Sequence, residues 1–203
     1  MTQIASGTLA RHNPFATEWT DAIPFRFEQG NWESNLQRLA DLQFLAAIVG
    51  AKGSGKTTLL ENLAEQLAPT RECHYCCFEH STANHDKIVG DLFRQIECGA
   101  ILLVDGIERL RWILRRKLFA AGKRQHGGLV VAVHKPCALP LWIECQPDLA
   151  TLRYVVDYLG FDTNSAVWQE SVSAFTRFEG NVRNVLRWLY DQVASGQLVI
   201  DVG

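Results

Sequence analysis

Short apolar runs and amphipathic repeats alternate along this chain. Almost continuously apolar runs stand at 44–49, 73–78, 100–104, 128–133 and 139–145. Before and between these runs, apolar residues recur every three or four positions, as they do in 31–42. Runs of the first kind predict buried strands, and repeats of the second kind predict helices with one buried face. Their alternation predicts an α/β fold with a mostly parallel sheet of about five strands flanked by helices.

From Gln146 onward the pattern is wholly helical. One apolar stripe comprises Leu149, Leu152, Val155, Val156 and Leu159, and another comprises Val182, Val185, Leu186, Leu189, Tyr190 and Val193. The "DTNS" stretch at 162–165 offers capping side chains between them. We therefore expect a small helical appendage, with the terminal "LVIDV" as a candidate edge strand.

The N-terminal segment has neither pattern. Its prolines, glycines and scattered aromatic residues predict an irregular extension that lies across the main domain. Its "NPF" and "IPF" pieces can act as a clamp or can cover a base. The expected domains are an N-terminal extension at 1–35, a core at 36–146 and a helical lid-like appendage at 147–203.

A glycine-rich motif interrupts the passage from the first predicted strand to its helix. Residues 50–57 read "GAKGSGKT", which fits G-x-x-x-x-G-K-[ST] without a mismatch. Glycines let the backbone N–H groups converge on phosphate oxygens, and the helix that follows presents its positive N-terminus to the same anion. This phosphate-binding loop, or P-loop, predicts contacts from Gly50, Ala51, Lys52, Gly53, Ser54, Gly55, Lys56, Thr57 and Thr58.

Two side chains of the loop have specific expected roles. Lys56 is expected to reach the β and γ phosphates, and the Thr57 hydroxyl is expected to join the coordination of Mg²⁺. The chain lacks a guanine-reading N-K-x-D element, which favours ATP over GTP as the nucleotide. The expected ligands are therefore ATP and Mg²⁺.

Three polar residues at the ends of later strands extend the predicted site. Asp105 ends "ILLVD", where its carboxylate can hold Mg²⁺ together with Thr57, or can simply begin a turn. Glu108 can polarise an attacking water or can favour a helix N-terminus electrostatically. His134 can sense the γ phosphate or can bond a nearby backbone group.

Composition narrows the classes of partner. The chain is 47% hydrophobic and 21% charged with a net charge of -2, so nothing in the global charge favours nucleic acid or an acidic membrane. The sequence has no stretch long enough to span a membrane and no signal peptide, so we expect a cytoplasmic protein with reduced cysteines. The series Cys73, Cys76, His80 and His85 resembles a zinc site, but its spacing is too short for a zinc finger.

A basic amphipathic helix is expected after Asp105. Its inward residues are Ile107, Leu110, Ile113, Leu114, Leu118 and Ala121, and its outward residues are Arg109, Arg111, Arg115, Arg116 and Lys117. Long arginines on such a helix ordinarily only solvate that face, so nucleic acid is not the expected partner. Residues 109–124 are nevertheless the one candidate for such contact, and Trp112 with these arginines can equally bind a protein.

Together, "GAKGSGKT", "ILLVDGIE" and His134 resemble the P-loop ATPases of the additional-strand class, and more narrowly the AAA+ group, over residues 36–190. "FEGNVRNVLRWLYD" is similar to the sensor-2 helix of the AAA+ lid, which implies that Arg183 contacts the γ phosphate. The sequence departs from the family at Gly106, where AAA+ proteins usually carry a catalytic Glu. The nearest carboxylate is Glu108, and an arginine finger has no clear candidate beyond Arg111, Arg115 and Arg116 of a neighbouring subunit.

The resemblance implies a slow ATPase that couples nucleotide state to movement of its helical lid, with Lys56, Glu108, His134 and Arg183 as catalytic residues and an unidentified protein or a second copy as partner. "VDGIER" also resembles the "LDGFPR" segment of adenylate-kinase-like enzymes, which would make Arg109 a ligand of an acceptor monophosphate. A third hypothesis is a nucleotide-gated interaction module with negligible turnover, which the Gly at 106 favours.

Overall fold

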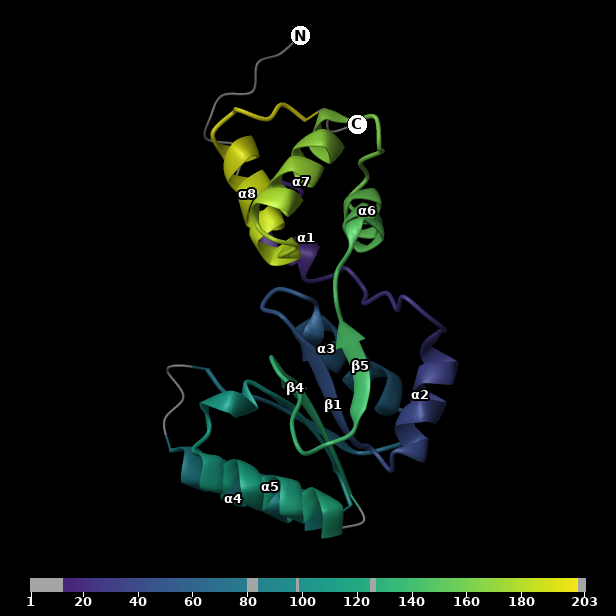
Figure 1. Ribbon diagram of the computed structural model, residues 1–203, viewed down its shortest axis with the longest axis vertical. Coiled ribbons are helices and arrows are strands. Elements are labelled where there is room, and N and C mark those ends of the chain that lie inside the picture. The colour runs from purple at the N-terminus through teal and green to yellow at the C-terminus, as the bar shows by residue number, and fades with distance from the viewer. Residues whose placement is uncertain (1–12, 80–83, 98, 125–126, 201–203) are drawn as a thin grey trace. The chain divides into compact units, whose positions relative to one another are not determined.

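Five parallel strands form one sheet in the order β2-β3-β4-β1-β5 (Figure 1). The strands are β1 (Leu45–Gly50), β2 (Cys73–Cys77), β3 (Ile101–Asp105), β4 (Gly128–Val133) and β5 (Leu141–Cys145). The structure, a computed structural model, describes residues 13–79, 84–97, 99–124 and 127–200. It confirms the predicted α/β class, the parallel sheet and the five strand positions.

Helices cover both faces of this sheet, as the continuously apolar strands predicted. The helices are α2 (Trp32–Asp41), α3 (Lys56–Leu67), α4 (His85–Glu97) and α5 (Trp112–Arg124). Alternate strand residues enter two separate cores, because successive side chains of a strand point to opposite faces. Ala46 and Ile48 of β1 pack with α2 and α3, whereas Ala47 and Val49 pack with α4 and α5. The strands therefore hold their C-terminal ends at one edge, between two helical layers.

The fifth strand is fastened to α2 by a buried tryptophan. Trp142 is 1% exposed, and its Nε1 donates a hydrogen bond to the Asn35 carbonyl at 2.9 Å. Arg38 on the same helix donates to the Trp142 carbonyl at 3.0 Å. Asn31 is the N-cap of α2: its side chain accepts a hydrogen bond from the Ser34 amide, and the Ser34 hydroxyl accepts one from the Asn31 amide. Helix α2 thereby fixes β5 beside β1.

Two compact units divide the described residues. One contains residues 25–51 and the described part of 55–145, and the other contains 13–24, 52–54 and 146–200. The second unit is built from α6 (Leu149–Tyr158), α7 (Ala166–Arg177) and α8 (Val182–Ala194), together with the short α1 (Thr17–Thr20). The side chains of Leu152, Val156, Val167, Ala174, Val185 and Leu189 form its core. The predicted C-terminal helices are therefore present.

The described N-terminal segment is part of the helical unit. Phe15 is buried in its core and stacks on Phe161 with ring centroids 5.6 Å apart. The Asn13 amide, which is fully buried, donates to the Tyr190 carbonyl at 3.0 Å. The hypothesis that the "NPF" piece covers a base is therefore wrong, because the Phe15 ring is already enclosed.

Two further expectations need correction. The described residues 198–200 of the terminal "LVIDV" form no strand, and its last two residues lie outside the described part. The basic helix does not begin at Ile107: a 3₁₀ turn spans Ile107–Arg109 and α5 starts only at Trp112. That turn shifts the helical phase, so Leu114 and Leu118 face the core and Ile113 is 43% exposed instead of inward.

The capping of α6 gives a prediction that depends on pH. The Asp148 carboxylate accepts hydrogen bonds from the amide and the hydroxyl of Thr151, at 2.8 and 2.9 Å, and these bonds lower the pKa of Asp148. A lowered pKa stabilises the fold above the pKa of the unfolded chain, and this contribution is lost as the pH falls through the lowered value. We expect Asp148→Ala to cost about 1 kcal/mol near neutral pH, measured by urea unfolding.

The matched control is Ser165→Ala. Ser165 caps α7 through an uncharged hydroxyl that accepts from the Trp168 amide at 3.1 Å. Its loss should cost a similar amount, but the cost should not change with acidity. The difference in unfolding free energy caused by Asp148→Ala should shrink below about pH 4, whereas that of the control should remain. Parallel pH profiles for the two variants would contradict the assignment.

Candidate functional site

The loop between β1 and α3 leaves the first amides of α3 without a side-chain cap. Gly53 and Gly55 have positive φ angles of 79° and 88°, a conformation that side chains other than glycine rarely adopt. Gly55 is the N-cap of α3 and supplies no side-chain acceptor. The first N–H groups of a helix have no intrahelical partner. Glycine at these positions thus provides a loop whose following helix offers uncapped amides to an anion.

Lys56 places a buried positive charge within this loop. Its side chain is 7% exposed, and its Nζ donates to the carbonyls of Gly50 and Ala51 at 2.9 and 2.7 Å. Cys145 pairs with Gly50 in the sheet, and it is close enough to Lys56 for the lysine charge to lower the pKa of its thiol. Burial nevertheless raises the pKa of the Cys145 thiol to about 12, with the Lys56 charge opposing that rise. The thiol stays neutral, so it does not cancel the lysine charge.

A buried hydroxyl of the loop also has an unused hydrogen-bonding capacity. Ser54 is 7% exposed, and its Oγ has no hydrogen-bond partner among the residues that the structure describes. A buried polar atom without a partner is costly, and in native proteins such atoms are uncommon. Together with the uncapped helix start, this hydroxyl fits the requirement of a loop that receives an acceptor-rich group such as a phosphate.

Thr57 and Asp105 meet across 48 residues of sequence. The Thr57 hydroxyl, in the first turn of α3, donates to Oδ2 of Asp105 at the end of β3, with a distance of 2.6 Å. A hydroxyl and a carboxylate side by side are hard oxygen donors, the kind that Mg²⁺ prefers. The two residues predicted to share a metal ion are therefore adjacent. The donor set fits magnesium.

Neighbours of Asp105 on β2 were not predicted from the sequence. Cys77 pairs with Asp105 in the sheet register, and Tyr75 lies two residues earlier on the same strand. Burial, followed by the Asp105 charge, raises the pKa of both groups, so both stay protonated at neutral pH. Only the strand register reveals this arrangement, and the sequence alone offered no signal for it.

Glu108 and His134 contact each other. Oε1 of Glu108 accepts a hydrogen bond from the His134 amide at 2.7 Å, and Nδ1 of His134 lies 3.3 Å from the Gly50 carbonyl oxygen. Strand β4, which ends just before His134, lies directly beside β1. Glu108 is in the 3₁₀ turn rather than in an α-helix. The bond of His134 to a backbone carbonyl corresponds to the alternative that the sequence left open.

Gly106 explains why Asp105 has no carboxylate directly after it. Its φ angle is 70°, and a Cβ at this position would come within 2.3 Å of the Phe78 carbonyl oxygen. No side chain fits there without a shift of the backbone. Glu108, two residues further on, is the first acidic side chain after Asp105.

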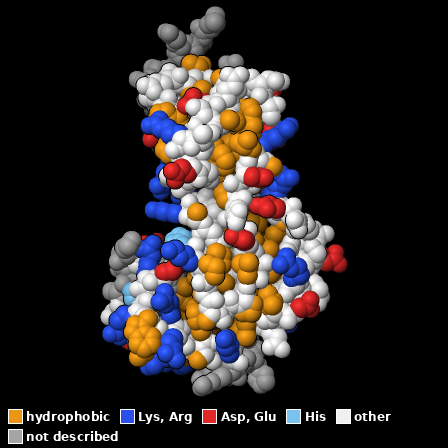
Figure 2. All heavy atoms as spheres, viewed as in Figure 1, with side chains coloured by type: hydrophobic (Ala, Val, Ile, Leu, Met, Phe, Trp, Pro, Cys, Tyr) orange, Lys and Arg blue, Asp and Glu red, His pale blue; other side chains and the backbone are white. Residues whose placement is uncertain are grey.

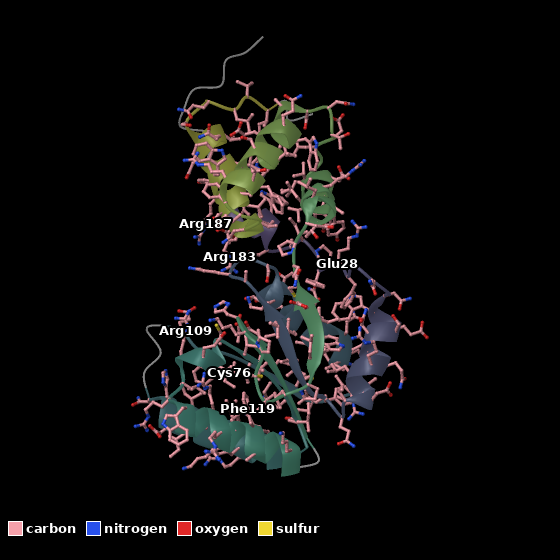
Figure 3. The ribbon with its side chains drawn as sticks, in the orientation of Figure 1. Glu28, Cys76, Arg109, Phe119, Arg183 and Arg187 are labelled. Carbon is pink, nitrogen blue, oxygen red and sulfur yellow. The ribbon has the colours of Figure 1, made fainter. Side chains whose placement is uncertain are left out.

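Of the remaining predicted residues, Arg183 belongs to the helical unit, and part of the proposed zinc series lies outside the described residues. Arg183 is exposed on α8 in the helical unit, where it extends to the same side of the helix as Arg187 (Figure 3).

The zinc hypothesis gains no support: no three His, Cys, Asp or Glu side chains cluster within the described ranges, and His80 falls outside them. No helix in the described part of the chain is long and apolar enough to cross a membrane.

No protein-family model and no curated protein matches this sequence. Solved structures do match, and among them is a mutant of RuvB from Thermotoga maritima, with a TM-score of 0.49 and 14% sequence identity. That match covers 79% of this chain and 69% of the other. A likeness this distant does not bear on activity, so the function has to be argued from the site itself.

Proposed function

We propose that this chain is a cytoplasmic Mg·ATP-binding protein of the P-loop class. The observation that carries the proposal is the hydrogen bond between Thr57 and Asp105 at the mouth of a glycine loop. The loop supplies amides and the Lys56 charge for the phosphates, and the Thr57–Asp105 pair supplies oxygens for the metal. Bound magnesium would neutralise phosphate charge and orient the γ phosphate for attack.

The sheet order supports the additional-strand class within that group. β4 lies between the loop strand β1 and the Asp105 strand β3, which is the insertion that gives the class its name. His134 at the end of β4 is therefore next to the loop, where its side chain can respond to a change at the γ phosphate. Arg183 is proposed to contact the same phosphate from the helical unit and to couple nucleotide state to movement of that unit.

We propose that any hydrolysis is slow, because of the turn after Asp105. Gly106 excludes the usual carboxylate, and Glu108 is engaged with the His134 amide. To act as a general base, Glu108 would have to release that amide and bind a water, which adds an energetic cost to catalysis. The same contact favours a second candidate, a nucleotide-gated interaction module that binds ATP without turnover.

The test is calorimetric titration of ATP with excess Mg²⁺ or with EDTA. We expect tighter binding with magnesium, and we expect Asp105→Asn to abolish that difference because the neutral amide no longer attracts the cation. Asp157→Asn, a change at an exposed carboxylate of α6, is the control and should retain the full magnesium effect. An unchanged magnesium effect in Asp105→Asn would refute the metal assignment.

Phosphate release separates the candidate activities. A slow ATPase releases phosphate from ATP without an acceptor, a gated module binds ATP and releases none, and a kinase forms ADP only when a nucleoside, monophosphate or sugar is added. Running these assays with ATP and GTP also tests the proposed preference for adenine.

A further inference from the structure

A cluster of positive charge lies on helix α5 and in the turn before it. Seven of its 20 Lys and Arg residues, and none of its 22 Asp and Glu residues, lie between 109 and 124. The protein as a whole carries a net charge of -2, so this segment is opposite in sign to the remainder. A local positive field of this kind attracts polyanions even when the global charge does not.

The apolar side of α5 is already occupied. Leu114 and Leu118 are buried in the core that α5 shares with α4 and the sheet, and they are 5% and 0% exposed. The opposite side follows helical spacing through Trp112, Arg115, Arg116 and Lys123, which we call the α5 outer face. These positions run about 16 Å along the helix, at 1.5 Å per residue. The outer face is thus a basic stripe with an aromatic end.

Trp112 is the most exposed aromatic side chain of the sheet-containing unit. Its exposure is 61%, and the Arg116 guanidinium lies 5.7 Å from the centroid of its ring. A guanidinium over the ring of an exposed indole combines a phosphate-binding group with an aromatic surface on which a base can stack. Packing in the hydrophobic core does not explain why a tryptophan stands at this position, because most of its side chain is exposed.

The acidic groups of the neighbouring helix leave the outer face uncompensated. On α4, Asp86 pairs with Arg111 at 3.2 Å, and Asp91 pairs with Arg94 of its own helix. Within the described residues, no ion pair involves Arg115, Arg116 or Lys123. Figure 2 shows Lys and Arg side chains gathered around exposed apolar atoms over this part of the surface.

We propose that the α5 outer face binds single-stranded nucleic acid, with phosphates at Arg115, Arg116 and Lys123 and one base stacked on Trp112. An anionic membrane fits less well, because the leucines that would insert into it are buried in the core. An acidic protein also fits less well as the partner, because it has no bases that would stack on the exposed indole next to the positive charges. The inference goes beyond nucleotide binding and uses none of the loop residues.

The decisive experiment compares two ligands on the unmodified protein. Fluorescence anisotropy measures binding of a labelled oligothymidylate of about 20 nucleotides and of an abasic strand of equal length. Stacking on Trp112 predicts tighter binding of the strand that carries bases, by roughly tenfold. Equal affinities would overturn the proposal, and so would binding only to vesicles of phosphatidylserine and phosphatidylcholine.

Two variants divide the interaction into its parts. Trp112→Ala should weaken oligothymidylate binding roughly tenfold and leave its salt dependence unchanged, whereas Trp19→Ala, at a 53% exposed tryptophan of the helical unit, should change neither. The double variant Arg115→Ala/Arg116→Ala should lower the slope of log K against log salt by about 1.4, measured between about 50 and 200 mM salt. Arg153→Ala, at an exposed arginine of α6, is the charge control. If Trp112→Ala and the double arginine variant bound oligothymidylate as their controls do, the α5 outer face would not be the binding site for nucleic acid.

Discussion

Lys56→Ala should lower the affinity for Mg·ATP by about 100-fold, because one charge-assisted interaction contributes roughly 1.5 to 3 kcal/mol and each 1.4 kcal/mol is a factor of ten. The lysine ammonium is buried and held by two loop carbonyls, at 2.9 and 2.7 Å. In the nucleotide complex it would direct its charge to the phosphates. Titration calorimetry on the folded proteins compares the Mg·ATP affinity of the variant with that of the unmodified chain.

Lys52→Ala is the matched control for this variant. Lys52 belongs to the same loop and carries the same charge, but its side chain is exposed. Its expected contribution to phosphate binding comes from the backbone amide, which alanine preserves. We therefore expect a change of affinity of about threefold or less, in line with an exposed charge. If Lys56→Ala bound ATP as tightly as Lys52→Ala does, the loop would not be a nucleotide site.

Trp142→Ala should destabilise the sheet-containing unit by about 3 to 5 kcal/mol, the range found for removal of a buried aromatic side chain. The indole is 1% exposed and packs in the core that α2 and α3 share with the sheet. Its loss leaves a cavity and also removes the donor to the Asn35 carbonyl. Urea unfolding followed by circular dichroism measures the change in free energy of unfolding.

The neighbouring residue on the strand provides the control. Leu141 is 52% exposed, on the side of β5 opposite to Trp142, so Leu141→Ala should cost within about 0.5 kcal/mol. Trp142→Phe should fall between the two, because it keeps part of the packing and loses the hydrogen bond. Equal costs for Leu141→Ala and Trp142→Ala would contradict the inferred role of Trp142 in holding β5 to α2.

The hydrophobic pattern was sufficient to predict the five strands of the sheet. The apolar runs at 46–49 and 129–133 are buried on both faces of the sheet, and few alternatives to a central parallel strand exist for such runs. The phase of α5 was not predictable, because a 3₁₀ turn and an αR helix place the same apolar residues differently. Ile113 fitted the expected stripe only if the helix began at Ile107.

The candidate site also has a part that the sequence predicted and a part that it did not. The loop motif and Asp105 were recognisable because each combines a residue type with a position at a strand end, and the structure brings Thr57 and Asp105 into contact. The contact between Glu108 and the His134 amide depends on which strands are neighbours. So does the position of Cys77 beside Asp105. Strand order depends on the packing of the whole sheet, so it could not be predicted from local sequence patterns.

The left-handed turn at Gly106 constrains how this protein can change. An engineer who wished to speed turnover by grafting a glutamate directly after Asp105 would first have to move the Phe78 carbonyl, which stands 2.3 Å from the new Cβ. A glutamate at position 106 would therefore also require a shift of the segment that follows β2. The backbone at Gly106 therefore restricts which residue can follow Asp105, whatever the activity of the protein.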